Sequence, residues 1–523
     1  MKLYRNILSA ALGSGLVLFA AGCTNSYESY NQNPTGVTKS EMERDAYSLS
    51  AAMLNLESWV VPADVNTHQF TECLSGGSWG GYLADSNSGF AGKNFAQYSP
   101  ENGWNRVMFK DIIPKMFIYS NEVYNVTEDP VPRAVATIIK VSGMLRVTDA
   151  FGPIPYSKVG EDGNITAPYD SQQDVYNLMF SQLNESIQDL MANETANFSP
   201  NADHVYDGNV VKWIKYANSL KLRMAIRISK ADPNKAQQEA ESAVNNAFGV
   251  ITSNADNAFL TLSNTNPFEV IMYVYNGGDS RVSADITSYM NSYNDPRRQA
   301  MFTVSTFEDP NFPNGYYGIR NGIAIPDGAI AHAYSNYNVK TTDKLMWMNA
   351  AEVAFLRAEG ALRSWNMGGD AKQFYEQGIQ LSFDQWGVKG AEEYIADRQH
   401  VPTSYSDPAG MFGYAGVTST ITIAWDEAAS FDKNLERIIT QKWIANFPLG
   451  QEAWAEYRRT GYPLLMPVVV NNSGGVVDSK KGARRQAYPQ EERTNNIDNY
   501  NTALTLLGGP DNMATDVWWA KSK

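Results

Sequence analysis

The sequence predicts a mostly α-helical protein in which tetratricopeptide-like helical hairpins support a loop-rich, irregular part. Two observations predict the helices. Apolar residues recur at helical spacing in several segments, and these segments come in pairs with short connections. A third observation predicts the irregular part, because residues 75–100, 262–340 and 401–430 do not follow a helical pattern.

The N-terminal residues are typical of a secretory signal peptide (1–22). A short positive region precedes an apolar stretch (7–21) that is too short for a membrane span. Small residues then precede Cys23, which resembles the bacterial lipobox, where the cysteine carries the acyl chains. We therefore expect lipid attachment at Cys23 and a flexible stalk over 23–44. The alternative is an ordinary signal peptide cut near Ala21, which leaves Cys23 free.

The rest of the chain, 45–523, is expected to form one body. A capping-box variant, "SQQD", begins one helix at Ser171, and Asp232 followed by Pro233 begins another. Arg223 and Arg227, four residues apart on a helix, are expected to meet carboxylates. A strand is expected at "TITIAW". The helices are expected at 45–59, 131–148, 171–191, 210–229, 232–249, 345–363, 370–383, 435–445 and 451–459.

Composition narrows the function classes. A net charge of −14 argues against binding to nucleic acid, whose phosphates would be repelled. The two cysteines exclude a disulfide framework. The four histidines never occur at i, i+4 spacing, so a histidine zinc site has little support, and no cofactor is expected.

The first loop, 75–100, is dense in aromatic residues with interleaved amides and acids. Such a mixture suits a carbohydrate, because a flat ring can pack on the C–H face of a sugar while polar groups bind its hydroxyls. Glycines surround Trp79 and Tyr82, so these two rings are the first candidates, with Asn87 beside them. The competing interpretation is that the rings pin the loop to the helical body.

The second loop, 262–340, offers a similar mixture in "MYVYNGGDSR" and "NGYYGIR". Its aromatic excess is smaller than that of the first loop. The candidate ligand-binding residues here are Tyr273, Tyr275, Asn276, Asp279, Arg281, Tyr316 and Tyr317.

An enzymatic alternative rests on "GGSWG", which matches the G-x-S-x-G nucleophile elbow and would make Ser78 the nucleophile of an esterase. That motif works only as a sharp turn from a strand into a helix, and the sequence around Ser78 predicts neither element. A glycosidase would need only a pair of carboxylates, which the composition cannot exclude. At "DHVYDGN", Asp203 and Asp207 would suit calcium or a plain turn.

Eight segments in order resemble the SusD/RagB family, and within it the SusD-like branch. The first is the cysteine followed by "NQNP". The others are "WNRVMFKDIIPKM", "DAFGPIPY", "YDGNVVKWIKYANSLKLRMAIRIS", "NDPRRQAMF", "WMNAAEVAFLRAEGALR", "ERIITQKWIANF" and the C-terminal "RRQAYPQEERTNNIDNYNTAL…GGPDNMATDVWWAK".

The resemblance implies a nutrient-binding outer-membrane lipoprotein that faces the cell exterior. It implies paired helices that carry a ligand-binding loop region, and it implies a partner, a SusC-like TonB-dependent barrel. Such a protein captures an oligosaccharide, or in some relatives a peptide, and delivers it for import without acting as an enzyme. Individual ligand residues do not follow from the resemblance, because the binding loops vary between family members. A secreted hydrolase is the alternative function.

Overall fold

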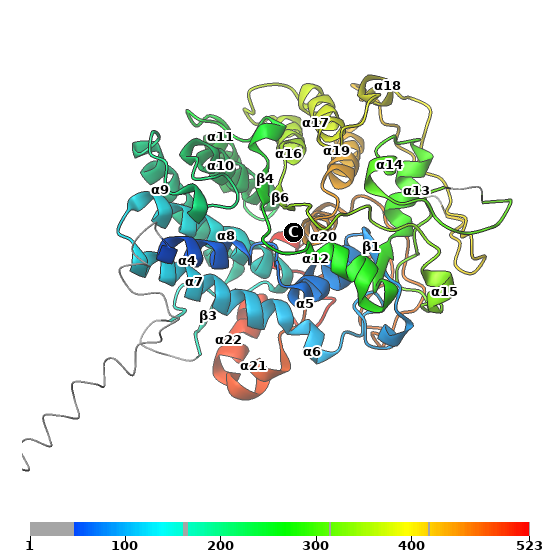
Figure 1. The fold of residues 1–523 in the computed structure, drawn as a ribbon, viewed down its shortest axis with the longest axis horizontal. Coiled ribbons are helices and arrows are strands. Elements are labelled where there is room, and N and C mark those ends of the chain that lie inside the picture. The colour runs from blue at the N-terminus through cyan, green and yellow to red at the C-terminus, as the bar shows by residue number, and fades with distance from the viewer. Residues whose placement is uncertain (1–46, 161–165, 313–314, 417–418, 522–523) are drawn as a thin grey trace, which may run out of the picture. The chain divides into compact units, whose positions relative to one another are not determined.

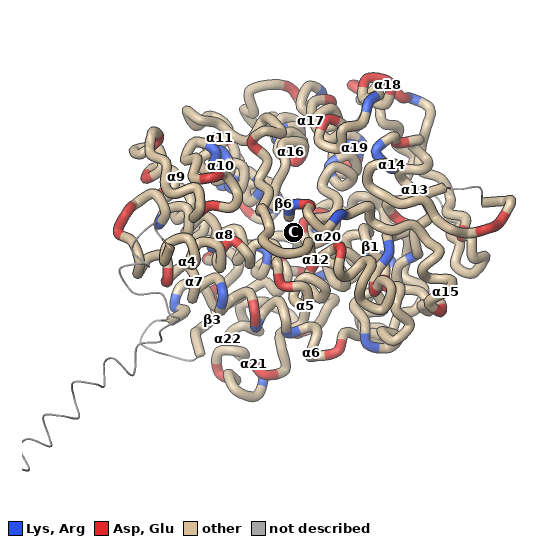
Figure 2. Tube along the Cα trace, in the orientation of Figure 1, with Lys and Arg blue, Asp and Glu red and all other residues tan. Residues whose placement is uncertain are grey.

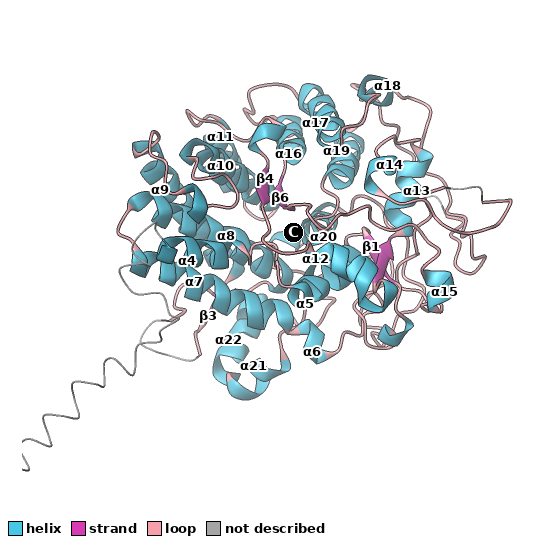
Figure 3. Cartoon of the chain, in the orientation of Figure 1, coloured by secondary structure: helices cyan, strands magenta, loops and turns pink. Residues whose placement is uncertain are grey.

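Paired helices dominate the computed structural model, which describes residues 47–160, 166–312, 315–416 and 419–521 (Figures 1 and 3). The expectation of a mostly helical chain is confirmed. The predicted signal peptide, Cys23 and the predicted stalk over 23–44 lie outside the described residues. The α-helices are α4 (Tyr47–Glu57), α5 (Val65–His68), α6 (Asn102–Asn105), α7 (Ile113–Val126), α8 (Pro130–Phe151), α9 (Gln172–Ala192), α10 (Val210–Arg227), α11 (Pro233–Val244), α12 (Pro267–Glu269), α13 (Ala284–Ser292), α14 (Arg298–Met301), α15 (Gly328–Ala331), α16 (Ala350–Leu362), α17 (Ala371–Gln385), α18 (Ala391–Ile395), α19 (Phe431–Ala445), α20 (Gly450–Thr460), α21 (Gln490–Asn495) and α22 (Ile497–Leu507).

The long helices pack as successive hairpins within residues 49–523, which form one compact unit. Helices α7 to α11 contact one another in chain order, and α10 contacts α16, which packs against α17 and α19. Side chains fix where the helices begin. Ser171 caps α9 by accepting a hydrogen bond from the Asp174 N–H, and Asp232 caps α11 in the same way, with Pro233 in the first turn. Both caps confirm the sequence prediction.

Three short antiparallel strand pairs join segments that are distant in the sequence. Strand β1 (Leu83–Asp85) pairs with β5 (Ser280–Val282), β2 (Ile154–Pro155) with β3 (Tyr169–Asp170), and β4 (Ala258–Leu260) with β6 (Leu345–Met348). The first pair matters most, because it holds the two long predicted loops, 75–100 and 262–340, against each other.

Two local predictions are wrong. The helix expected over 345–363 begins only at Ala350, because Asn349 caps it and the four preceding residues form β6. The strand expected at "TITIAW" does not form. Its buried carbonyls are bonded by side chains instead of by a neighbouring strand: the Tyr375 hydroxyl donates to Ile423 O at 2.6 Å, and the Tyr293 hydroxyl donates to Ile421 O.

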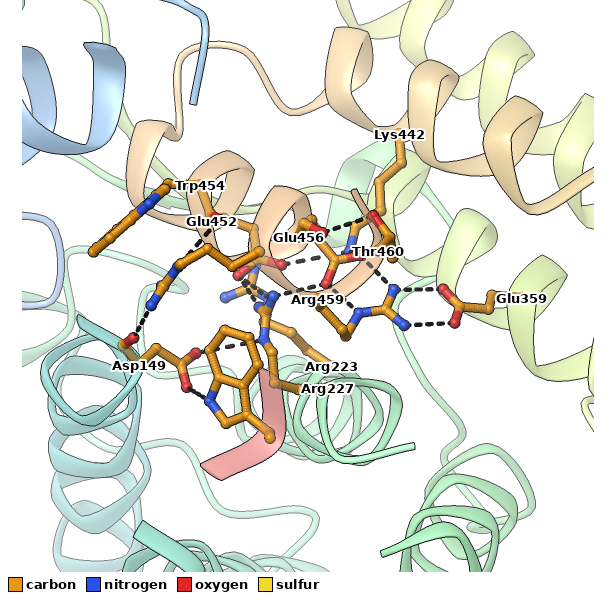
Figure 4. A network of polar contacts seen from close by, with 12 residues as sticks. Asp149, Arg223, Arg227, Glu359, Lys442, Glu452, Trp454, Glu456, Arg459 and Thr460 are labelled. Carbon is orange, nitrogen blue, oxygen red and sulfur yellow. Dashed lines mark hydrogen bonds and ion pairs between the residues drawn. The ribbon is translucent and has the colours of Figure 1, made fainter. Parts of the chain in front are cut away.

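A buried network of ion pairs joins the helical hairpins at the centre of the body (Figure 4). Basic positions recur along α10 (blue in Figure 2), and two of them meet acids as predicted. Arg223 pairs with Glu352 at 2.7 Å, and Arg227 Nη1 lies 2.7 Å from Glu456. Burial alone would raise the pKa of Glu456, but the surrounding cations, Arg459 foremost, hold that pKa well below its usual range. The network therefore fixes α10 against α16 and α20.

None of the helices in the described ranges is long and apolar enough to cross a membrane.

Candidate functional site

The β1–β5 strand pair brings segments of both predicted loops together around one buried carboxylate, that of Asp279. Its Oδ2 accepts a hydrogen bond from Gln69 Nε2 at 2.7 Å. Its Oδ1 accepts from Asn87 Nδ2 at 2.7 Å and from Asn276 Nδ2 at 2.8 Å. Three of the predicted site residues, Asn87, Asn276 and Asp279, are therefore brought together, although Asp279 itself is only 3% exposed. The three side-chain amides around Asp279 are called the amide cluster below.

Two π-helical segments adjoin the amide cluster: η2 (Gln69–Gly77), which Gln69 begins, and η8 (Val270–Val274), whose Ile271 O accepts a hydrogen bond from the Asp279 N–H at 3.0 Å. A third π-helical segment, η4 (Met108–Ile112), is joined to α5, the helix before η2, because the Thr67 hydroxyl donates to Asp111 at 3.4 Å. Wide helical turns are rare and occur frequently at functional sites. Their convergence supports this region as the candidate site.

Aromatic rings line the surface beside the amide cluster. Tyr273, on η8, is 39% exposed, and its hydroxyl donates to Tyr337 O. The neighbouring Tyr275 is half-buried, with its hydroxyl 3.4 Å from Asn66 Oδ1 on α5. These two predicted rings therefore lie at the edge of the region that Asp279 organises.

A second set of rings at this surface was not predicted from the sequence. Phe70 and Phe90 both pack on Trp104, with ring centroids 5.3 Å and 5.0 Å apart, and all three are only partly buried. Lys93 Nζ lies 5.5 Å from the centre of the Trp104 ring. Phe70 and Trp104 fall just outside the loop 75–100. A search of the loop's flanks for aromatic residues would have found them. We call these three rings the Trp104 platform.

An open groove of about 690 Å³ lies beside the same segments. It runs between the start of α5 and η8, and it is lined by Asp64, Val65, residues 262–265, Val270, Thr341 and Thr342. Its walls therefore carry hydroxyl, amide and apolar side chains together with the Asp64 carboxylate. A flexible chain of polar units, such as a sugar chain, finds both kinds of contact there.

Trp79 and Tyr82, the first candidates of the sequence analysis, are buried. The indole N–H of Trp79 donates to Phe95 O at 2.9 Å, and its ring packs 4.6 Å from that of Trp454. Tyr82 is fully buried, and its hydroxyl donates to Trp443 O. Their placement matches the competing interpretation, in which the rings pin the loop to the helices.

The glycines around these two rings explain why they are buried. A Cβ atom added at Gly450, the first residue of α20, would lie 2.3 Å from the backbone N of Gly77. One added at Gly80 would lie 2.8 Å from the Ala453 Cβ. The glycine run therefore serves the close packing of η2 on α20, and the rings are carried into the core with it.

The other predicted residues stabilise the loop itself. The buried Arg281 donates to the carbonyl oxygens of Met272, Gly277 and Ser280, which fixes the turn that carries Asn276. The half-buried Tyr316 and Tyr317 contact different groups. The Arg298 guanidinium lies 5.7 Å from the Tyr316 ring, and Phe312 packs against the Tyr317 ring.

The Ser78 esterase alternative lacks the geometry of a nucleophile elbow. Ser78 follows the π-helical η2 rather than a strand, and its buried hydroxyl has no hydrogen-bond partner among the described residues. A nucleophile would need a base within hydrogen-bond reach.

The calcium alternative at "DHVYDGN" also fails, because the Asp203 carboxylate is already occupied. It accepts hydrogen bonds from the backbone N–H groups of Val205, Tyr206 and Gly208 and from the indole N–H of Trp213. Within the described ranges, no group of three or more His, Cys, Asp or Glu side chains is arranged to hold a metal ion.

Comparisons with known proteins agree with this architecture. A family model described as SusD-like, "Susd and RagB outer membrane lipoprotein", matches residues 29–520. A SusD homologue from Bacteroides uniformis has 51% sequence identity over 91% of this chain and 100% of its own, with a TM-score of 0.88. One from Bacteroides thetaiotaomicron has 42% identity over 91% of this chain and 99% of its own, with a TM-score of 0.85.

A third solved structure carries a ligand in its description. It is a chitin-binding SusD homologue from Flavobacterium johnsoniae, with 39% identity over 91% of this chain and 99% of its own and a TM-score of 0.86. No curated protein matches the chain. The family model covers most of the sequence, and the solved homologues share its fold at substantial identity. The chain therefore belongs to the SusD-like family of SusD and RagB outer membrane lipoproteins.

Proposed function

We propose that this protein is a non-catalytic, surface-facing lipoprotein that captures an oligosaccharide, or a peptide, and delivers it to a SusC-like TonB-dependent barrel. Family membership supports the general role, and the chitin-binding homologue supports carbohydrate as the ligand class. The observation that carries the proposal is the meeting of accessible rings with oriented amides beside the π-helical segments η2 and η8.

The proposed site binds a sugar chain through two kinds of contact. Tyr273, Tyr275 and the Trp104 platform pack on the C–H faces of sugar rings. The exposed Asn276 offers an amide oxygen to hydroxyl groups while its N–H group is held by Asp279. Trp79 and Tyr82 support the site from within the core and do not contact the ligand.

Binding without turnover tests the function. The mature chain is titrated in a calorimeter with chitohexaose, maltoheptaose and a tryptic digest of casein, and each mixture is then analysed for products. We expect saturable binding of at least one probe and no product. Release of sugars or new peptides by the wild type, lost in Ser78→Ala, would support the hydrolase instead.

Ring variants test the location of the site. Trp104→Ala and Tyr275→Ala are expected to weaken binding of that probe about tenfold each, because a stacked aromatic contributes roughly 1–1.5 kcal/mol. Phe431→Ala is the control, since this exposed ring on α19 contacts Arg363 instead of the amide cluster or the Trp104 platform. If all three variants bind the probe as tightly as the wild type, the site lies elsewhere.

Anchoring and partnership need separate experiments. Acylation at Cys23 would hold the body on a bilayer, because each buried CH₂ adds about 0.8 kcal/mol. Cys23→Ser is expected to move the protein from the membrane fraction to the soluble fraction. Affinity purification of the wild type from detergent extracts is expected to recover a TonB-dependent barrel. Retention of Cys23→Ser in the membrane would refute the lipid anchor.

A further inference from the structure

Two buried aspartates lie next to each other at one end of the β1–β5 strand pair, but their surroundings differ. Asp279, one residue before β5, is 3% exposed, and both of its oxygens accept hydrogen bonds from the amide cluster. Asp85, the last residue of β1, is 5% exposed, and neither of its oxygens has a hydrogen-bond partner in the described part of the chain. Asp85 lies opposite Ser280 in the strand register, next to Asp279.

The three donors to Asp279 come from three separate segments. Gln69 begins η2, Asn87 precedes the short η3 helix (Ser88–Phe90), and Asn276 lies in η9 (Tyr275–Gly277). Hydrogen bonds to an ionised acceptor are about twice as strong as neutral ones. Asn276 has φ of 52°, in the left-handed region, so the contact with Asp279 holds its backbone in a costly conformation. A charged Asp279 therefore orders all three segments at once.

The surroundings of Asp85 favour its neutral, protonated form, whereas those of Asp279 favour a negative charge. Burial first, and the negative charge of Asp279 second, raise the pKa of Asp85 to about 7. A second negative charge at this place would repel Asp279 and would have no donor to receive it. A neutral Asp85 leaves the charge of the pair on Asp279, where the amides meet it.

The other ionisable groups around Asp85 are engaged elsewhere. Glu72, on η2, pairs with Arg146, and burial raises the pKa of the Cys73 thiol well above its usual range, which keeps the thiol neutral. Arg281, on β5, donates to backbone carbonyls, and His332 contacts Gly278 O at 3.1 Å. None of these groups forms a hydrogen bond with Asp85.

We propose that Asp279 is the positioning residue of the ligand site and that Asp85 is kept as an uncharged acid beside it, so that the three amides align on a single buried charge. This inference rests on the proposed function, because it assigns the amide cluster to ligand binding. Asp279 acts through Asn87 and Asn276 and does not itself touch the ligand.

The same substitution at the two aspartates separates the roles. Asp279→Asn removes the charge and one acceptor oxygen, so we expect the affinity for the bound probe (chitohexaose, maltoheptaose or casein peptides) to fall at least tenfold. Asp85→Asn resembles the neutral acid in shape and charge, so we expect its affinity to stay within twofold of the wild type at pH 6. Equal affinities of Asp279→Asn and wild type, or an equal loss in both variants, would overturn the inference.

Hydrogen–deuterium exchange tests the positioning without any ligand. Asp279→Asn is expected to speed exchange of the backbone amides in residues 87–90 and 274–278 relative to Asp85→Asn, while the helical hairpins keep their protection. Equal exchange of these loops in the two variants would overturn the inference. If the wild type binds none of the probes, the proposed function fails, whereas the exchange experiment still decides whether Asp279 orders the loops.

The pH dependence of exchange protection in β1 and β5 tests the protonation state of Asp85, because a contact without a titrating group would give no such dependence. An acid whose pKa is raised on folding stabilises the closed strand pair fully below pH 4, and this contribution is lost as pH rises to about 7. In the wild type, exchange protection of the amides in β1 and β5 is therefore expected to fall roughly fifty-fold between pH 5 and pH 7 and then to level off. Asp85→Asn should abolish this fall. A wild-type profile that is flat over this range would contradict a neutral Asp85.

Discussion

Replacing Arg459 with methionine should destabilise the fold strongly, because this fully buried guanidinium joins two helices through carboxylates. It lies 2.7 Å and 2.6 Å from the two Glu359 oxygens on α16, and it donates to both oxygens of Glu456 on its own helix, α20. Methionine fills similar space but leaves both acids short of a partner. Breaking a buried ion pair by removing one side costs about 3–5 kcal/mol.

The remaining partners place the expected loss at the lower end of that range. Glu359 keeps Arg363 at 2.7 Å, and Glu456 keeps Lys442 at 3.1 Å and Arg227 at 2.7 Å. We therefore expect the free energy of unfolding at pH 7, from urea titration followed by circular dichroism, to fall by about 3 kcal/mol. The double variant Arg459→Met, Glu359→Gln should recover part of the loss, because it removes one of the unpaired charges.

The pH dependence of the same variant checks the sign of the effect. In the wild type the folded-state pKa values of Glu359 and Glu456 are lowered, so their contribution is present above the unfolded-state pKa and is lost as pH falls. The difference between wild type and Arg459→Met should accordingly shrink below pH 4, where protonated carboxyl groups no longer need the cation. A loss below 1 kcal/mol at pH 7, or one that grows on acidification, would refute the reasoning.

Two further predictions address the packing around the site. Gly450→Ala should lower the free energy of unfolding, measured by urea titration, by about 2 kcal/mol or more, because its Cβ would lie 2.3 Å from the Gly77 backbone N. Gly103→Ala is the control, because its Cβ would meet only a side chain at 3.7 Å. An unchanged free energy of unfolding in Gly450→Ala would contradict the close packing of η2 on α20. Burial lowers the pKa of His68 to about 4, so the neutral ring's contribution to stability is lost as pH falls from 6.5 to 4, by up to about 3 kcal/mol. His68→Gln should remove that share of the acid destabilisation. If the free energy of unfolding of this variant depends on pH as in the wild type, His68 is charged in the folded protein.

The helical body could be predicted because its signals are local. Ser171 and Asp232 cap the helices that their sequence context indicates, and Arg223 and Arg227 meet acids as their spacing suggests. Local signals failed at Leu345–Met348, where pairing with β4 outweighs the helical pattern that follows it. Only contacts between residues that are distant in the sequence could have shown this strand.

The site was harder to predict for the same reason. Loop composition identified Tyr275 and Asn276, which lie at the surface, but also Trp79, which the Gly450–Gly77 contact carries into the core. Trp104 was missed because it joins the candidate site only through packing on Phe70 and Phe90, which lie in two other segments. The burial of Asp279 depends on the β1–β5 pairing, which no local pattern specifies.

A crystal structure of the mature chain with its bound ligand tests the central claim most directly, using whichever of chitohexaose, maltoheptaose and casein peptide binds most tightly. The account predicts ligand density that packs on Tyr275 and the Trp104 platform and accepts or donates hydrogen bonds at Asn276, with Asp279 buried beneath it. Ligand density on another face, such as beside Tyr316 or Phe431, with the amide cluster unoccupied, would contradict the account.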